Sequence, residues 1–174
     1  PESHHLRLFG DKAAARSAAH YAGVPVSKGT FGAVCLEQAE EFFDSANGSV
    51  IIKALSGGGG RGTRLVSHKE DLKEAFRACQ SEARKAFGIS DVYLEKFVEH
   101  ARHIEVQIIG DKYGNVAHLG DRECSVQRRN QKLVEIAPAP HLPDQLRDEI
   151  LESALKFARS QKYSSLGTFE YLLD

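Results

Sequence analysis

The chain has 174 residues, of which 41% are hydrophobic, so it can bury a substantial core and form one ordinary domain or two small ones. Its 23 basic and 24 acidic residues give a net charge of −1, which excludes a basic nucleic-acid footprint, and no apolar run reaches the length of a membrane span. Cys35, Cys79 and Cys124 are odd in number and widely spaced, which favours a reducing compartment over a disulfide framework or a zinc site. The first five residues have no apolar stretch of the kind that a secretory signal needs.

Apolar periodicity and turn residues predict helices and strands along the whole chain. A helix should begin after the capping residue Asp11 and end near Ala22, and another should cover residues 36–46. Amphipathic helices are expected at 70–87 and 144–162. Strands are expected at 49–55, 63–66, 92–98, 103–109, 115–119 and 168–172. This order predicts an α+β fold with antiparallel or mixed strand pairing.

The most specific local signal is the segment from Lys53 to Thr63, which contains four consecutive glycines. Bare backbone N–H donors between the positive charges of Lys53 and Arg61 are suited to binding phosphate. The segment is neither a P-loop nor a dinucleotide fingerprint, because both motifs need a helix at the last glycine, and the P-loop needs Lys-Ser/Thr where Thr63-Arg64 stands. We expect a strand, a glycine loop and a second strand: a hairpin flap that closes over a triphosphate. The alternative is a solvent-exposed linker.

Two predicted strands carry further polar chemistry. In the fourth, His103, Glu105 and Gln107 occupy alternate positions and share one face, which is either available for function or the solvated face of an ordinary strand. In the third, the pair Glu95-Lys96 interrupts an apolar run. It needs a partner, because an unpaired buried charge is costly, and the edge of a purine ring could supply one.

The segment from Arg122 to Lys132 is dense in cations and amides and has no helical or strand periodicity. Such a cluster is usually a solvated loop. The residues that follow, 133–138, read as a buried or edge strand. We therefore expect Arg128, Arg129 and Lys132 to face nucleotide phosphates, or a carboxylate or phosphate intermediate.

Taken in chain order, these motifs resemble the biotin carboxylase component of biotin-dependent carboxylases, a branch of the ATP-grasp superfamily. The matching segments are GDK at 10–12, IIKA at 51–54, the glycines of 57–62, LEKF at 94–97, RHIEVQ at 102–107, CSVQRR at 124–129, QK at 131–132, Glu135 with Ala137-Pro138, and GTFE at 167–170. They cover nearly the whole chain.

The resemblance implies an ATP-grasp fold with three segments. Residues 1–24 would form a helix that leads into the ATP-grasp region, 25–99 the lid subdomain with its flap, and 100–174 the first part of the C-terminal subdomain. A dinucleotide-fold-like domain would precede the chain. The second metal-binding glutamate, and the residues that handle bicarbonate and carboxybiotin, would follow Asp174.

The resemblance also implies roles for single residues. Lys132 would point into the active site near the phosphates and bicarbonate, together with Arg128 and Arg129. Glu170 would be the first of two glutamates that bind magnesium or manganese. Asn130 stands where the family commonly has His, so an amide donor remains but the option of positive charge is lost. The residues expected to contact the nucleotide are Lys12, Lys53, Gly58, Gly59, Gly60, Arg61, Gly62, Glu95, Lys96, Phe97, His103, Glu105, Gln127 and Asn130.

The implied activity is ATP-dependent conversion of bicarbonate to carboxyphosphate, followed by carboxylation of biotin on a carrier domain. The implied partners are that carrier domain and the carboxyltransferase of an acyl-CoA, pyruvate or urea carboxylase, with no nucleic acid and no membrane. The intact enzyme would be a homo-oligomer in the cytoplasm or the mitochondrial matrix, and the 174 residues alone would be inactive. The alternatives are another ATP-grasp ligase, such as the carbamoyl phosphate synthetase large subunit, and a non-catalytic nucleotide-binding module.

Overall fold

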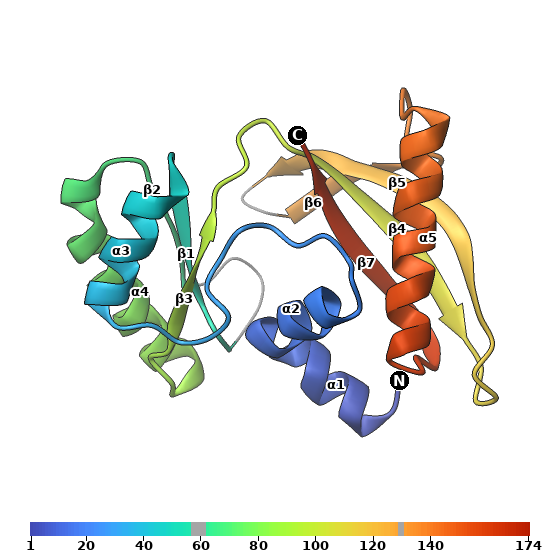
Figure 1. The fold of residues 1–174 in the computed structure, drawn as a ribbon, viewed down its shortest axis with the longest axis horizontal. Coiled ribbons are helices and arrows are strands. Elements are labelled where there is room, and N and C mark those ends of the chain that lie inside the picture. Colours follow the sequence, from blue (N-terminus) through green and yellow to red (C-terminus); the bar gives the residue numbers. More distant parts are fainter. Residues whose placement is uncertain (57–61, 129–130) are drawn as a thin grey trace. The chain divides into compact units, whose positions relative to one another are not determined.

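The computed structural model describes residues 1–56, 62–128 and 131–174, which form two compact units (Figure 1). The three-stranded unit consists of residues 7–21 and 25–97, and the four-stranded unit consists of residues 1–6, 22–24 and 98–174. Among the described residues, no helix has both the length and the apolar character needed to cross a bilayer.

The three-stranded unit is built on an antiparallel sheet in the order β2-β1-β3. Its strands are β1 (Val50–Ala54), β2 (Thr63–Val66) and β3 (Val92–Lys96), and its helices are α2 (Lys12–Tyr21), α3 (Leu36–Ala46) and α4 (Leu72–Phe87), with the short 3-10 turn η1 (Lys69–Asp71) before α4. Side chains alternate along a strand, so Val50 and Ile52 of β1 join the core under α3 and α4, and Lys53 lies on the opposite face.

The helix boundaries of this unit follow from capping residues that were visible in the sequence. Asp11 caps α2, because its Oδ1 accepts hydrogen bonds of 3.0 Å from the N–H groups of Ala13 and Ala14. Asn47, with φ 49°, ends α3, and Gly88, with φ 77°, ends α4. These three predicted helices are confirmed, with α4 beginning after η1 rather than at residue 70. Residues 1–24, expected as one helix from the resemblance, contain two helices, because α1 (Ser3–Gly10) precedes α2.

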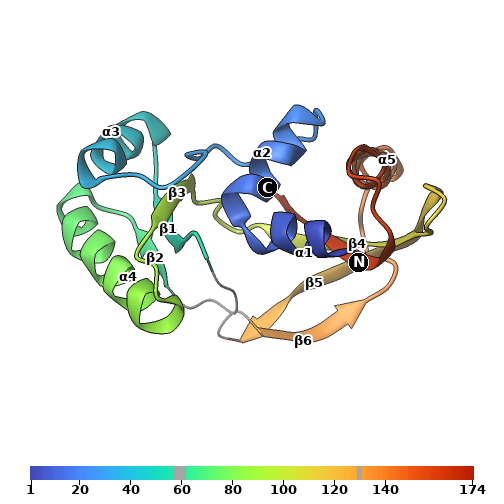
Figure 2. The same ribbon diagram turned by 90° about the horizontal axis from the view of Figure 1, so that it is seen from below.

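The four-stranded unit is an antiparallel sheet in the order β6-β5-β4-β7 with one helix on its face. The strands are β4 (Arg102–Gly110), β5 (Val116–Arg128), β6 (Gln131–Ile136) and β7 (Ser165–Leu173), and α5 (Asp144–Ser160) packs against β4 and β5 (Figure 2). Ile104, Val106 and Ile108 are fully buried. The predicted apolar face of β4 is therefore confirmed, and the alternate residues of β4 occupy the other face.

One part of the sequence reading was wrong. The strand expected to end at Leu119 continues to Arg128, and the segment from Arg122 to Lys132, expected as an irregular loop, belongs largely to β5 and β6. Irregularities in the β5–β6 register between Glu123 and Gln127 disrupt the strict alternation by which a strand is recognised. The residues after Lys132 form an edge strand as expected, but they are mostly exposed rather than buried.

Candidate functional site

The three-stranded unit carries a charged cluster on the sheet face opposite its core. Lys53 of β1 and Glu95 of β3 occupy this face, and the Nζ of Lys53 lies 2.9 Å from Oε2 of Glu95. Arg16 of α2 reaches the other carboxylate oxygen, with Nη1 3.2 Å from Oε1. Ser27 donates to Oε2 of Glu95 at 3.2 Å. With Lys12, these residues form what we call the Lys53 cluster.

Positive charge is concentrated in this cluster. Lys12, the first residue of α2, donates from Nζ to the carbonyl oxygen of Ala54 at 3.5 Å. Burial, and then the neighbouring charge of Lys53, lowers the pKa of Lys12 below its ordinary value, while Glu95 opposes this change. Two ammonium groups that destabilise each other in this way would both be stabilised by a bound anion such as a phosphate.

Glu95 is a buried carboxylate that is neutralised within its own unit. Burial would raise its pKa, but the charges of Lys53 and Arg16 outweigh that effect and hold the pKa below its ordinary value. The expectation that the charged residues of this strand need a partner is therefore confirmed for Glu95. Within the protein, Lys53 and Arg16 are the partners of this side chain, and a purine edge at this strand stays a prediction.

Some main-chain N–H groups at the end of β3 already donate hydrogen bonds within the protein. The N–H of Lys96 donates to the carbonyl oxygen of Lys28 at 2.7 Å, and the N–H of Phe97 donates to that of Ser49 at 2.9 Å. The side chain of Lys96 is exposed. A purine edge at this strand would therefore have to be contacted by other main-chain groups of residues 95–97.

The hairpin that holds the glycine segment is partly described. Gly62, with φ 65°, accepts hydrogen bonds from the N–H of Ala54 at 2.7 Å and from Sγ of Cys79 at 2.9 Å. A Cβ at residue 62 would lie 2.9 Å from the Cβ of Ala54, so a side chain is excluded there. The next residue begins β2, not a helix, which agrees with the rejection of the P-loop and the dinucleotide fingerprint. Four expected nucleotide contacts lie outside the described residues: Gly58, Gly59, Gly60 and Arg61.

The four-stranded unit carries a second cluster, on the sheet face opposite α5. In the register of the sheet, Glu105 of β4 lies between Glu170 of β7 and Arg122 of β5. Lys132 of β6 binds Glu105, and its Nζ lies 2.5 Å from Oε1 of Glu170. Arg122 donates from Nε to Oε1 of Glu105 at 2.7 Å and lies 3.3 Å from Oε2 of Glu135. These five residues form the Lys132 cluster.

The ion pairs of the Lys132 cluster fix its protonation states. Burial would raise the pKa of Glu105, but hydrogen bonds from Lys132 and Arg122 outweigh it and hold the pKa below its ordinary value. Burial would lower the pKa of Lys132, but hydrogen bonds to Glu105 and Glu170 raise it above its ordinary value. At neutral pH Lys132 therefore remains an ammonium group, suited to stabilising negative charge rather than to accepting a proton.

Glu170 is the residue of this cluster whose chemistry suits a magnesium ion. Its side chain is 57% exposed, and a carboxylate oxygen is the ligand that a hard cation prefers. A second possible group consists of Glu105, Cys124 and Glu135, whose ligand atoms lie within 4.8 Å of one another. Burial, and then Glu105, raises the pKa of Cys124 to about 11, so its thiol stays protonated and is a poor ligand for a hard cation.

The remaining residues predicted in this unit lie around the Lys132 cluster. The main-chain N–H of His103 donates to Oγ of Ser125 at 2.8 Å, and the side-chain amide of Gln127 donates to the carbonyl oxygen of Cys124 at 2.9 Å. Arg128 is exposed at the end of β5 and is not among the residues that form ion pairs in the cluster. Arg129 and Asn130 lie outside the described residues.

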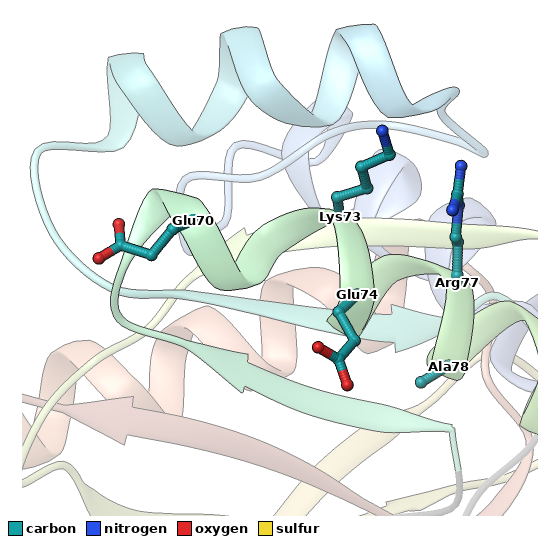
Figure 3. A pocket seen from close by; sticks show the side chains of 5 residues that line it. All are labelled: Glu70, Lys73, Glu74, Arg77 and Ala78. Atoms are coloured by element: carbon teal, nitrogen blue, oxygen red, sulfur yellow. The ribbon is translucent and has the colours of Figure 1, made fainter.

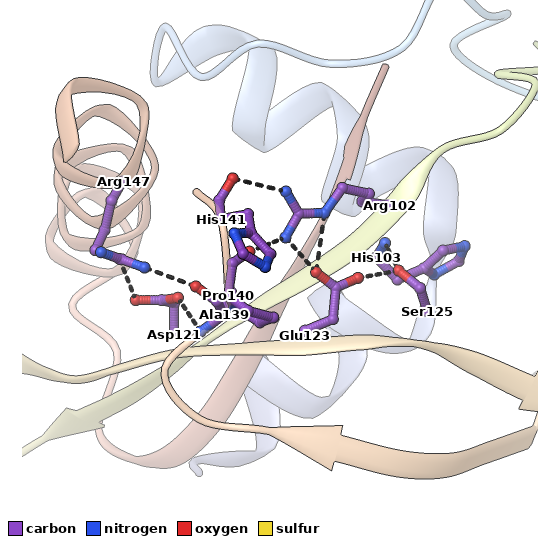
Figure 4. A network of polar contacts seen from close by, with 9 residues as sticks. All are labelled: Arg102, His103, Asp121, Glu123, Ser125, Ala139, Pro140, His141 and Arg147. Carbon is purple, nitrogen blue, oxygen red and sulfur yellow. Dashed lines mark hydrogen bonds and ion pairs between the residues drawn. The ribbon is translucent and has the colours of Figure 1, made fainter. Parts of the chain in front are cut away.

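A polar network anchors the segment after β6 to the sheet (Figure 4). Arg102 binds Glu123 with Nε at 2.9 Å and donates to the carbonyl oxygen of Pro140 at 2.6 Å. Glu123 also binds Ser125, whose hydroxyl oxygen accepts the N–H of His103. Earlier in β5, Asp121 accepts the N–H of Ala139 at 2.8 Å and binds Arg147 of α5 at 3.1 Å. The network therefore fixes the backbone at His103 from the side of the sheet that carries α5.

Two cations in these clusters were missed as site residues. Arg16 follows Lys12 by one helical turn, and this i, i+4 spacing on an otherwise alanine-rich helix was a signal that could have been read. Arg122 had no such signal, because its position beside Glu105 depends on the continuation of β5 beyond residue 119.

A surface hollow on the outer side of α4 contains none of the predicted site residues that the structure describes. Figure 3 shows its lining residues, Glu70, Lys73, Glu74, Arg77 and Ala78.

Comparison with known proteins relates this chain to a family. Residues 11–174 match the family described as "Carbamoyl-phosphate synthase L chain, ATP binding domain". Pyruvate carboxylase of Bacillus subtilis is 51% identical over 174 residues, which are 99% of this chain and 15% of that protein. Pyruvate carboxylase 1 of Caenorhabditis elegans is 52% identical over 170 residues, 97% of this chain and 14% of that protein.

Solved structures of biotin carboxylases have the same fold. The biotin carboxylase of Campylobacter jejuni in a β,γ-ATP complex superposes with a TM-score of 0.94 at 45% identity, covering 97% of this chain and 38% of that one. The biotin carboxylase domain of Hydrogenobacter thermophilus 2-oxoglutarate carboxylase, in complex with MgADP, ADP and bicarbonate, gives a TM-score of 0.93 at 44% identity, with coverage of 97% and 38%. The chain thus spans a minor part of each relative.

Proposed function

Because this chain belongs to the family of carbamoyl-phosphate synthase L chain ATP-binding domains, we propose that it is the ATP-binding part of a biotin carboxylase, in a protein that carboxylates biotin with ATP and bicarbonate. The relatives named above are pyruvate carboxylases and biotin carboxylases, which favours this function over that of a carbamoyl phosphate synthetase large subunit. The ATP-grasp fold and both charged clusters are in keeping with it.

The observation that carries the proposal is the pair Lys12 and Lys53 in the Lys53 cluster. Two ammonium groups lie close enough for one to lower the pKa of the other, and Glu95 only partly offsets their charge. Phosphate oxygens would complete this arrangement, since a charge-assisted hydrogen bond is about twice as strong as a neutral one. We assign Lys12 and Lys53, with the glycines of the hairpin and the main chain of residues 95–97, to nucleotide binding.

The Lys132 cluster would stabilise the negative charges on phosphate and on the anion derived from bicarbonate during the reaction. Lys132 keeps its proton, so it can stabilise phosphate and the anion derived from bicarbonate without taking part in proton transfer. Glu105 and Arg122 hold Lys132 and its surroundings in position. Glu170 would hold magnesium, which when bound neutralises phosphate charge. We assign His103 and Gln127 to contacts with the bound nucleotide.

The acceptor of the carboxyl group is proposed from the same relatives. Pyruvate carboxylases and a 2-oxoglutarate carboxylase both act, by name, on 2-oxo acids, so a 2-oxo acid such as pyruvate is favoured over an acyl-CoA or urea. The partners would be a biotin carrier domain and a carboxyltransferase, the assembly a homo-oligomer, and the compartment the cytoplasm or the mitochondrial matrix.

The proposal is tested by measuring phosphate release from MgATP by the full protein, with bicarbonate present. We expect release that depends on added biotin and is abolished by Lys132→Ala. Release that depends on ammonia instead of biotin would favour a carbamoyl phosphate synthetase. MgATP binding without turnover under any of these conditions would favour a non-catalytic nucleotide-binding module.

A further inference from the structure

Arg16 makes contacts that the proposed function does not yet explain. Its Nη1 donates to Oγ of Ser27 and its Nη2 to the carbonyl oxygen of Ser27, both at 2.8 Å. Nη1 also lies 3.2 Å from Oε1 of Glu95, and the arginine side chain is 12% exposed. One guanidinium group thus joins helix α2, the segment that follows it and strand β3.

The chain leaves space for this guanidinium at Gly29. A Cβ at that residue would lie 2.6 Å from Nη2 of Arg16 and 2.8 Å from the carbonyl oxygen of Leu94. The first contact shows that a side chain at residue 29 would displace Arg16, and the second that it would disturb β3. The position of Arg16 is therefore built into the packing of the segment that contacts it.

Arg16 and Lys53 divide the two oxygens of Glu95 between them. Arg16 approaches Oε1, while Lys53 at 2.9 Å and the hydroxyl of Ser27 at 3.2 Å bind Oε2. Two cations, Arg16 and Lys53, thus share the single carboxylate of Glu95, which neutralises only one of their two charges. Without Arg16, Lys53 would have to neutralise Glu95 largely by itself, and would be less available to an incoming anion.

The contribution of Arg16 to the stability of the fold does not by itself explain why its guanidinium group is buried here. The Nε of Arg16 is buried and has no hydrogen-bond partner among the described residues. An unsatisfied buried donor is destabilising, because it has lost its hydrogen bond to water without gaining another. A buried guanidinium that carries this cost is more readily understood from what its charge does for the neighbouring groups.

We propose that Arg16 is a positioning residue for phosphate binding: it holds and neutralises Glu95, so that Lys53 is fixed in place and keeps its charge for nucleotide phosphates. The inference rests on the proposed nucleotide-binding function. Arg16 is not required to touch the nucleotide, because it acts through Glu95 and Lys53.

The test is calorimetric titration of the full protein with MgADP, in the absence of bicarbonate and biotin, and with adenosine as the uncharged control. We expect Arg16→Gln to lower the affinity for MgADP about tenfold or more and to leave the affinity for adenosine unchanged. Arg16→Lys keeps the charge but cannot make both bonds to Ser27, so its loss should be smaller. Ser27→Ala, which keeps the main-chain bond, should lower MgADP affinity less than Arg16→Gln.

A double-mutant cycle shows whether Arg16 acts through Glu95. In a Glu95→Gln background, Arg16→Gln should change MgADP affinity by less than about threefold. Equal losses in both backgrounds, or equal losses for adenosine and MgADP, would overturn the inference. So would wild-type affinity in Arg16→Gln, or, where that variant does not fold by circular dichroism, wild-type affinity in both Arg16→Lys and Ser27→Ala. A wild-type protein that does not bind MgADP would instead contradict the proposed function, and the inference with it.

Discussion

Glu105 and Glu170 are direct neighbours on adjacent antiparallel strands, and the ammonium group of Lys132 binds both of them. Like charges placed directly opposite each other in a sheet are destabilising. Lys132 removes this repulsion, and Arg122 supplies a second cation to Glu105, the more deeply buried of the two carboxylates. The geometry thus makes Lys132 important for stability as well as for the proposed reaction.

Replacing Lys132 by Ala should destabilise the protein. Glu105 would keep Arg122 but lose the second of its two cations. Lys132 would also no longer offset the repulsion between Glu105 and Glu170. We expect a loss of about 1–3 kcal/mol, the range for an interaction with a partly buried charged group. Urea denaturation measures this, with Lys112→Ala, a lysine in the exposed turn between β4 and β5, as the control. A stability equal to that of the control variant would show that the bridge contributes nothing.

Stability should decrease under acidic conditions partly because of Glu105. Its pKa in the folded protein is held below the ordinary value of 4.5, so the unfolded chain binds a proton at a higher pH than the folded protein does. The stabilisation is therefore fully present above about pH 5 and is lost as the pH falls through the folded pKa. Urea denaturation as a function of pH should show a shallower acidic decline for Glu105→Gln. Parallel curves for the two proteins would exclude this contribution.

Lys53→Ala should weaken nucleotide binding in the full protein. A methyl group cannot replace an ammonium group that binds phosphate, and hydrogen bonds to charged groups contribute about 1.5–3 kcal/mol, or roughly 10- to 150-fold in affinity. Calorimetry with MgATP measures the loss, and Lys85→Ala, on the exposed surface of α4, is the matched control. Unchanged affinity in Lys53→Ala would remove this residue from the phosphate site.

The three cysteines should differ in their reactivity with a thiol reagent. Burial raises the pKa of both Cys79 and Cys124 to about 11, whereas Cys35 is exposed at the start of α3. A thiolate, not a thiol, is the nucleophile, so Cys35 should be modified first at pH 7.5. Peptide mass mapping after brief treatment with a maleimide measures the order. Modification of Cys79 or Cys124 at the rate of Cys35 in the folded protein would contradict the burial described for them.

Much of the local structure follows from the sequence alone. Asp11, Asn47 and Gly88 mark helix ends, because capping and left-handed backbone geometry depend on the residue at that position. The alternation along β4 correctly separated its apolar face, with Ile104, Val106 and Ile108, from the polar face of Glu105, because the period of a strand is a property of the backbone. The motifs, read in chain order, also identified the family, because the matching residues occur in segments along nearly the whole chain.

Only the tertiary structure decided which charges meet. Arg16 and Glu95 are far apart in the sequence, as are Lys132 and Glu170, and their contacts depend on helix packing and on strand register. The register of β5 and β6 includes irregularities that hide the strand pattern between Arg122 and Lys132, so Arg122 could not be placed beside Glu105 in advance. Local sequence determines the elements because their energetics are local, whereas the charge balance of each cluster depends on contacts between residues that are distant in the chain.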